Sequence, residues 1–231
     1  MAARDSASVS HFTTGPRFTE RFFARSSLDV APDLIGAYLV RTLDGGQRLV
    51  ARIVEVEAYR GDGSDPSAHS HRGPTPRNRV MFGAPGSLYV YRSYGIHSCA
   101  NVVCEPPDHG AAVLFRAVEP VSGGDAMRAR RGLPDGTTLH EISNGPGKLC
   151  QALDIRLDHD GASLLRGAIE LRSQAAGDPP ADVAVSPRIG ISEGALLPWR
   201  FYDRASPWVS RGRPGVAPAQ KRRRSGDSAT K

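Results

Sequence analysis

The chain has 231 residues, a formal net charge of +6, 25 Gly and 18 Pro, and aromatic residues make up only 6% of it. This length suffices for one large domain, and the many Gly and Pro residues favour a loop-rich fold over a helical bundle. The sequence has no run of about 18 apolar residues, which excludes a membrane-spanning helix. The opening residues lack the apolar segment of a secretory signal, and Cys99, Cys104 and Cys150 form no CxxC pair. We therefore expect a cytoplasmic protein with reduced cysteines and no membrane partner.

The positive charge is concentrated at the C-terminus. Residues 211–231 contain seven Lys or Arg and one Asp, whereas residues 1–210 contain 23 basic and 23 acidic residues. We expect residues 211–231 to form a disordered basic tail. Residues 1–17 are small and polar and predict a disordered N-terminal segment, which leaves residues 18–210 as the folded domain.

The first half of the domain predicts a helical region followed by a strand and a long loop. The helical pattern begins at Phe18 and is interrupted at Pro32. RLVARIVEVEAY (residues 48–59) alternates in polarity, which predicts a strand with Ile53, Glu55, Glu57 and Tyr59 on one face. Residues 60–86 are rich in Gly and Pro and have no periodicity, so they predict a long loop of the kind that is often functional.

The second half is dominated by short strands that pair locally. Residues 87–91 and 96–104 predict a β-hairpin that turns at Tyr94-Gly95, and residues 111–120 predict a central strand. Further along, the patterns predict two short helices (124–132 and 147–155), a linker (173–186) and a last strand, RIGI (188–191). Because strands outnumber helices, we expect a single α+β domain built on an antiparallel sheet.

Two carboxylates stand two residues apart on the predicted strand. Glu55 and Glu57 share a face, where like charges repel, so burying both without a role would be costly. One interpretation is a solvent-exposed strand face. A second is a general base at Glu57 that activates water. A third is a pair in a carbohydrate glycoside hydrolase, which needs two carboxyl groups about 5–10 Å apart.

A long basic segment has no acidic residue. Residues 66–104 contain no Asp or Glu but carry four Arg, three His and four aromatic residues. Cations that hold phosphates, interleaved with rings that stack on bases, are typical of nucleic-acid contact, although a polar loop and a tyrosine-rich hairpin would also fit. His69 and His71 lack a third ligand at a suitable spacing, so we expect no metal. GPGK at 145–148 departs from the Walker A pattern at Ile142 and Leu149, which leaves Lys148 as a contact for a single phosphate at most.

Several motifs in this order together resemble one family. The segments are VEVEAY (54–59), AHS (68–70), TPRNRVMF (75–82), GSLYVYRSYGIHSCANVV (86–103), LFRAVEP (114–120), NGPGKLCQAL (144–153) and RFYDRASPWVS (200–210). They are similar to the alkyladenine (3-methyladenine) DNA glycosylase family, of the methylpurine type, over residues 18–210. The resemblance implies a curved antiparallel sheet with a protruding hairpin that probes DNA. It also implies a monofunctional base-excision repair enzyme that flips alkylated or otherwise damaged purines out of double-stranded DNA and hydrolyses the N-glycosidic bond without metal or cofactor.

The resemblance also implies roles for individual residues. Glu57 matches the family's general base, and Arg116 matches the residue near the attacking water. The positions that match the substrate-binding residues are Tyr59, His69 and Tyr91, which stack on the flipped base, and Asn101, which screens it. The positions that match DNA-binding residues are the wedge Tyr94, its neighbour Ile96, and Arg77 and Lys148 at the DNA backbone.

Two positions depart from the family's pattern. His97 stands where an aromatic residue is expected, and Arg92-Ser93 is more polar than the apolar pair expected before the wedge. The alternatives to the enzyme are a catalytically inactive DNA-binding module of the same fold and a carbohydrate hydrolase that uses Glu55 and Glu57. We expect a monomer that acts in the bacterial cytoplasm in association with the nucleoid.

Overall fold

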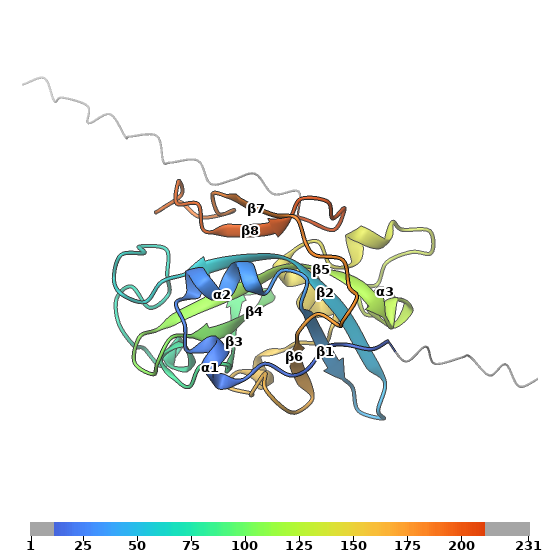
Figure 1. Ribbon diagram of the computed structural model, residues 1–231, viewed down its shortest axis with the longest axis horizontal. Coiled ribbons are helices and arrows are strands. Elements are labelled where there is room, and N and C mark those ends of the chain that lie inside the picture. Colours follow the sequence, from blue (N-terminus) through green and yellow to red (C-terminus); the bar gives the residue numbers. More distant parts are fainter. Residues whose placement is uncertain (1–11, 211–231) are drawn as a thin grey trace, which may run out of the picture.

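The computed structural model describes residues 12–210 (Figure 1). The predicted basic tail (211–231) and residues 1–11 of the predicted N-terminal segment lie outside the described residues. Residues 12–17 contact the domain, so the ordered contacts begin before the predicted boundary at residue 18. The Gly15 N–H donates to the Ser173 carbonyl at 3.0 Å, and Arg17 forms an ion pair with Glu170 at 2.7 Å.

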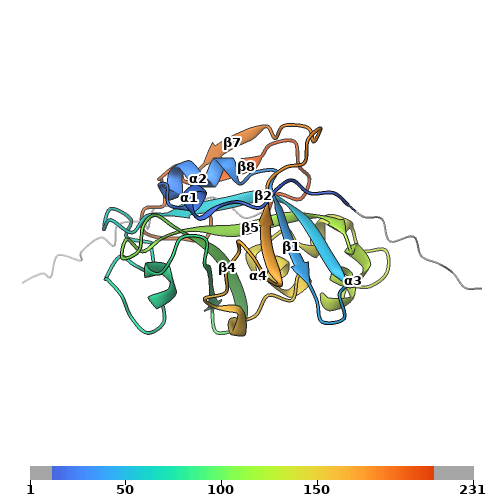
Figure 2. The same ribbon diagram turned by 60° about the horizontal axis from the view of Figure 1, so that its bottom comes forward.

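A curved antiparallel sheet forms the centre of the domain, as expected (Figures 1 and 2). Its strands are β1 (Tyr38–Thr42), β2 (Arg48–Tyr59), β3 (Leu88–Ser93), β4 (His97–Cys104), β5 (Ala111–Ser122), β6 (Ile169–Arg172), β7 (Val183–Ser186) and β8 (Arg200–Asp203). The main path runs β3-β4-β5-β2-β1-β6, and β8 pairs with both β2 and β7. Each neighbouring pair is antiparallel. The molecule is therefore a mixed α+β structure in which β2 and β5 are the long central strands.

Short helices cover the sheet. They are α1 (Glu20–Phe23), α2 (Ser27–Asp33), α3 (Gly124–Arg130) and α4 (Pro146–Ala152), with the 3-10 turns η1 (Arg79–Phe82), η2 (Leu139–Ile142) and η3 (Leu157–His159). The Ser26 side chain caps α2 by accepting from the Leu28 N–H, and the helix ends one residue after Pro32. Helix α2 packs on β2 and β5, whereas α4 packs on β4 and β5. These helices complete one hydrophobic core on the sheet.

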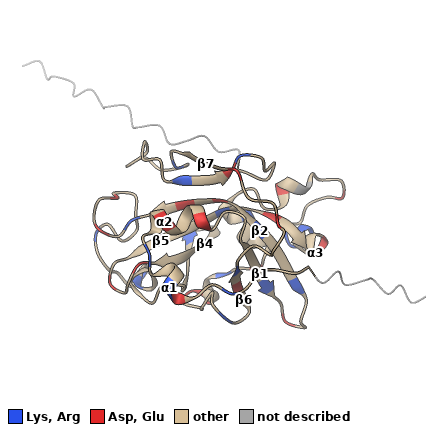
Figure 3. Ribbon diagram, viewed as in Figure 1, with Lys and Arg blue, Asp and Glu red and all other residues tan. Residues whose placement is uncertain are grey.

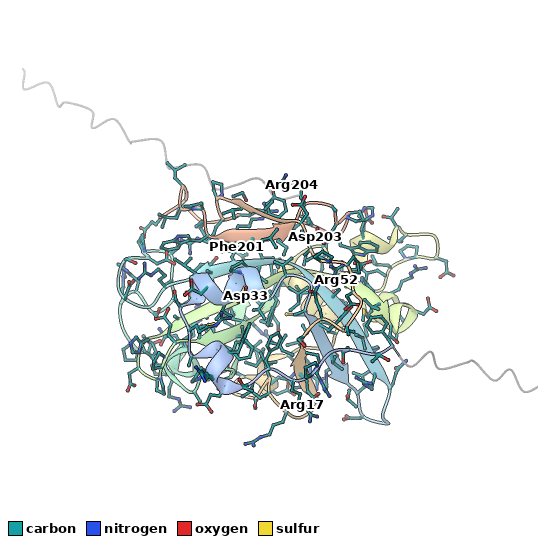
Figure 4. All side chains as sticks on the ribbon, in the orientation of Figure 1. Arg17, Asp33, Arg52, Phe201, Asp203 and Arg204 are labelled. Carbon is teal, nitrogen blue, oxygen red and sulfur yellow. The ribbon has the colours of Figure 1, made fainter. Side chains whose placement is uncertain are left out.

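The segment that follows β6 has more regular structure than its sequence predicts. Residues 183–186 of the predicted linker form strand β7, while residues 188–191 form no regular strand, so the predicted RIGI strand is wrong. Strand β8 pairs antiparallel with β2 beyond the part of β2 that pairs with β1, and Phe201 is opposite Val56. Figure 4 labels Phe201 and Asp203 on β8. Arg200 of β8 and the Ser210 N–H both donate to Glu55. The Ile189 N–H donates to Glu57, so the segment from Ile189 to Ser210 covers the face of β2 that carries these carboxylates.

Charged residues of both signs are mixed over the described domain (Figure 3). This distribution agrees with the equal numbers of acidic and basic residues before position 211. The interpretation of Glu55 and Glu57 as an exposed strand face is wrong, because both side chains are 0% exposed. Buried charges need compensating partners, so the region around these carboxylates is where a functional site should be sought.

Candidate functional site

A cavity of about 300 Å³ lies between the end of β2, the hairpin of β3 and β4, and the long loop before it. Its volume is at the lower end of the range for small-molecule sites, which suits a single flat ring system. Six of the residues predicted to form the site line it: Tyr59, His69, Arg77, Tyr91, Tyr94 and Asn101. These six residues are up to 42 positions apart in the sequence, and the cavity brings them together with Gly190 and Ile191.

The aromatic wall of the cavity comes from β3 and from the loop. Tyr89 and Tyr91 point to the same side of β3 because side chains alternate along a strand, and their rings stack with centroids 5.6 Å apart. His69 reaches them from the loop: its Nδ1 lies 3.0 Å from the Tyr89 hydroxyl, and its ring meets that of Tyr91 edge to face at 4.4 Å. Burial, with a contribution from Arg77, lowers the pKa of His69, so its ring is neutral near pH 7.

Asn101 is fixed beside this wall. It pairs with Tyr89 across β3 and β4, and its Nδ2 donates to the Tyr89 carbonyl at 3.0 Å. The residue is 4% exposed and lines the cavity. Because one amide donor is already engaged, the side chain cannot turn freely. It therefore presents a fixed polar edge to whatever occupies the cavity.

Glu57 lies beneath the cavity rather than on its wall. One carboxylate oxygen, Oε2, accepts from the Tyr59 hydroxyl at 3.0 Å and from Arg116 Nη1 at 3.2 Å. The other, Oε1, accepts from the Ile189 N–H at 2.7 Å. Burial raises the pKa of Glu57, while Arg116, the Ile189 N–H and Tyr59 act in the opposite direction. The result is a carboxylate with a greater affinity for protons than an exposed one, which is the property of a general base.

Glu55 is the second buried carboxylate and holds Arg116 from the other side. Its Oε1 accepts from Arg116 Nε at 3.0 Å and from Arg200 Nε at 2.7 Å. Ser210 donates to it twice, through its N–H at 2.6 Å and its hydroxyl at 2.8 Å. Two carboxylates and two guanidinium groups thus balance in charge, which a buried cluster requires.

Tyr59 connects the buried carboxylate to the cavity. Its hydroxyl donates to Glu57, and its ring forms part of the cavity wall. Arg188 supports the ring from within the protein, with its guanidinium carbon 4.5 Å from the ring centroid. Arg188 is fully buried and forms a bidentate pair with Asp65, both contacts measuring 2.7 Å. This contact fixes the ring beside Glu57.

The hairpin between β3 and β4 ends in exposed apolar side chains. Tyr94 is 89% exposed and Ile96 is 74% exposed. The turn places both Tyr94 and Gly95 at positive φ, +50° and +71°, as a type I′ turn requires, and the Ile96 N–H donates to the Ser93 carbonyl at 3.1 Å. Positive φ is uncommon for a bulky residue such as Tyr, and such strain clusters at functional positions. The predicted pairing of these two segments into a β-hairpin is confirmed, and its tip carries exposed apolar side chains beside the cavity.

The remaining predicted residues lie apart from the cavity. Arg116 is paired with Glu57 underneath it, and Ile96 lines a separate hollow between the hairpin and α4. Lys148 is on α4, where its ammonium donates to Asn144 Oδ1 at 2.7 Å. The structure therefore separates the candidates into a cavity wall, a buried charged cluster and an outer rim.

Sequence reasoning missed several residues of the site. Ile189 acts through its backbone N–H, which no side-chain pattern reveals. Arg188 stands directly before Ile189-Gly190-Ile191 in a stretch with few other charges, and that pattern could have indicated a buried ion pair. Arg200 and Ser210 belong to the RFYDRASPWVS motif, whose charged partners are more than 140 residues away on β2.

The described residues, 12–210, contain neither a cluster of metal ligands nor a membrane-spanning helix. In this range no three His, Cys, Asp or Glu side chains lie close enough together to hold a metal ion. Nor does any helix in the described part of the chain have the length and apolarity needed to cross a membrane.

Comparison with known proteins assigns the chain to a family. The family model for methylpurine-DNA glycosylase matches residues 21–207. A relative from Rhodopseudomonas palustris (strain HaA2) is 51% identical over 196 residues, covering 85% of this chain and 91% of the relative. Others from Nitrobacter winogradskyi and Methanoculleus marisnigri are 50% and 49% identical, covering 85% and 82% of this chain and 88% and 96% of theirs. All three are provisionally named 3-methyladenine DNA glycosylases. The match of the family model over nearly the whole described domain shows that the chain belongs to the methylpurine-DNA glycosylase family.

Proposed function

We propose that this DNA glycosylase flips alkylated purines of the 3-methyladenine type out of duplex DNA and hydrolyses their N-glycosidic bond. The observation that carries the proposal is the contact between Tyr59 and Glu57, because it joins a ring-lined cavity to a buried carboxylate. A base within a duplex cannot reach such a cavity, so the nucleotide must leave the stack. The unstacking costs a few kcal/mol and is cheapest for a damaged, poorly paired base.

The cavity favours a positively charged base. N3- and N7-alkylated purines are cations, and the faces of aromatic rings attract cations by about 0.5–2 kcal/mol each. Tyr59 and Tyr91 supply two such rings, and the neutral ring of His69 adds no opposing charge. Undamaged purines lack the positive charge, so they bind the aromatic rings less strongly. Asn101, held by the Tyr89 carbonyl, would screen the exocyclic group of the base.

Glu57 would act as the general base. As the bond between the base and the sugar lengthens, positive charge develops on the sugar, and an ionised carboxylate stabilises it. Water then attacks the sugar carbon while Glu57 takes its proton, and the bonding electrons leave with the purine. An alkylated purine cation leaves as a neutral base, so it needs no proton donor. Arg116 would hold Glu57 in position through the 3.2 Å contact.

Tyr94 would fill the space that the flipped nucleotide leaves. It stands exposed at the tip of the hairpin, on the rim of the cavity that would receive the base. An aromatic side chain inserted between base steps compensates for part of the lost stacking and slows the return of the base. The monomeric state and the location at the nucleoid stay predictions.

The proposal is tested with Glu57→Gln and duplexes that each carry one defined lesion. The amide has nearly the same shape but cannot take a proton from water, so we expect single-turnover excision to fall by about 10²–10⁴-fold. Binding of the lesion duplex should persist. Glu20→Gln, an exposed position on α1, serves as the control. Excision by Glu57→Gln within about tenfold of the parent rate would remove the general-base role, and a parent protein that binds without excision would favour the inactive DNA-binding module.

A further inference from the structure

Another hollow, of about 490 Å³, lies on the other side of the cavity wall. It is distinct from the hollow between the hairpin and α4, and we call it the second hollow. Arg77, Tyr91 and Arg92 line both the cavity and the second hollow, so these three side chains form a ridge between them. Gly95, at the hairpin turn, belongs to the second hollow, which thus reaches the base of the wedge. Any strand whose base occupies the cavity must cross this ridge or its rim.

The ridge carries two cations without acidic partners. Within residues 12–210, neither Arg77 nor Arg92 comes within 4.0 Å of a carboxylate, whereas Arg60, Arg156 and Arg172 are each paired with one. Arg77 Nη2 donates to the Arg92 carbonyl at 3.0 Å, and Arg92 Nη1 lies 3.5 Å from the Gly95 carbonyl. A guanidinium has five donors, so most of them face solvent here and are available to an anion.

The rest of the second hollow fits a sugar-phosphate chain. Leu157 is 40% exposed and offers apolar contact to a deoxyribose. Asp160 is the acidic member of its lining, but its Oδ1 accepts from the Val90 N–H at 2.8 Å at the edge of β3. The ridge therefore keeps an excess of positive charge over this carboxylate. Guanidinium groups bind phosphate by paired, charge-assisted hydrogen bonds, which gives the contact a defined geometry.

We infer that Arg92, together with Arg77, forms a subsite for a phosphate of the damaged strand next to the flipped nucleotide, and that the second hollow receives the adjoining deoxyribose. The inference rests on the proposed function. Arg92 is on β3 and is two residues before Tyr94, so the phosphate contact and the wedge belong to one hairpin. The contact of Arg92 with the phosphate would thereby determine how deeply Tyr94 enters the duplex.

The experiment measures duplex binding by Arg92→Met as a function of salt. The duplex carries one alkylated or etheno-purine on a 2′-fluorinated sugar, whose electron-withdrawing fluorine suppresses cleavage. Loss of one phosphate contact should make the slope of log K against log salt shallower by about 0.9 and weaken binding about tenfold at low salt. Arg92→Lys should restore part of both. Arg72→Met is the matched control, because Arg72 is exposed on the preceding loop and lines neither hollow.

Replacing single phosphates of the DNA by uncharged methylphosphonates identifies the phosphate that Arg92 contacts. Single methylphosphonates are placed in turn at the phosphates flanking the lesion. At one of them the parent protein should lose about as much affinity as Arg92→Met loses on normal DNA, and Arg92→Met should lose nothing more. If Arg92→Met matches Arg72→Met in salt slope and at every methylphosphonate, the subsite does not exist. Equal binding of damaged and undamaged duplexes by the parent protein would instead overturn the proposed function.

Discussion

Gly147 in α4 allows the hairpin to lie close to that helix, because it has no Cβ atom. A Cβ atom added at Gly147 would lie 2.9 Å from His97 Cβ and 3.1 Å from His97 Cγ. Carbon atoms in contact are normally about 3.5–4.0 Å apart. His97 begins β4 directly after the exposed tip, so Gly147→Ala must move the hairpin away from α4 by roughly the missing 0.5–1 Å.

The expected loss of stability is small because two effects oppose each other. Overpacking costs about 1–3 kcal/mol, and Ala is favoured over Gly in a helix by about 1 kcal/mol. The net change of about 0–2 kcal/mol would lower Tm by about 2–4 °C for each kcal/mol in a chain of this size. Gly145→Ala is the matched control. Its φ of 171° is extended backbone, and its nearest neighbour, Lys148 Cδ, would be 3.7 Å away.

The effect on function should be larger than the effect on stability. A displacement of about 1 Å in a positioning element can reduce a rate by up to about 10²-fold. The clash is at His97, beside the tip, whereas Tyr91 and Asn101 lie further along the two strands. Gly147→Ala should therefore displace the wedge more than the cavity wall, and excision from duplex DNA should fall more than excision from single strands. The assay is single-turnover excision from both substrates, with melting curves for both variants. Equal rates and equal Tm for Gly147→Ala and Gly145→Ala would refute the steric argument.

Three more perturbations have defined outcomes. Tyr94→Ser should reduce excision from duplexes more than from single strands, where no stack needs refilling; equal losses would remove the wedge role. Excision of 7-methylguanine, which leaves as a neutral base, should rise with pH along an acid limb. Burial raises the pKa of Glu57, so its ionised form, which acts as the base, appears at a higher pH than that of an exposed Glu. A rate that does not change between pH 4 and 8 would argue against this assignment. Deleting residues 211–231 should make the salt slope of non-specific binding shallower by about 0.9 per lost contact and leave saturating single-turnover excision unchanged; an unchanged slope would make the tail inert.

Local patterns predicted the elements that depend on neighbouring residues. Alternation, turn residues or helical spacing over short stretches of sequence predicted strand β2, the β3–β4 hairpin and helices α3 and α4. The motif order identified the family, and six of the carried-over residues meet in one cavity. The residues that determine each of these elements lie within or next to the element in the sequence.

Features that depend on partners far away in the sequence could not be predicted from local patterns. Alternation placed Glu55 and Glu57 on one face of a strand. It could not tell that Arg200 and Ser210 contact Glu55 there, because they are 145 and 155 residues away in the sequence. The strand β7 was missed since its two exposed valines sit in a stretch rich in Pro, Asp and Ala. The backbone donor at Ile189 has no side-chain signature at all.

The partners of the two buried carboxylates have a consequence for how the chain is made. Glu55 and Glu57 leave the ribosome early, but Arg116, Ile189, Arg200 and Ser210 follow in that order, and the last contact joins residues 155 apart in sequence. A nascent chain that stops short of Ser210 has the pocket residues but an incomplete set of donors for its buried acids. The competent enzyme thus exists only once synthesis of the domain is nearly finished. Contacts of such separation also close slowly, which makes the charged cluster a late event in folding.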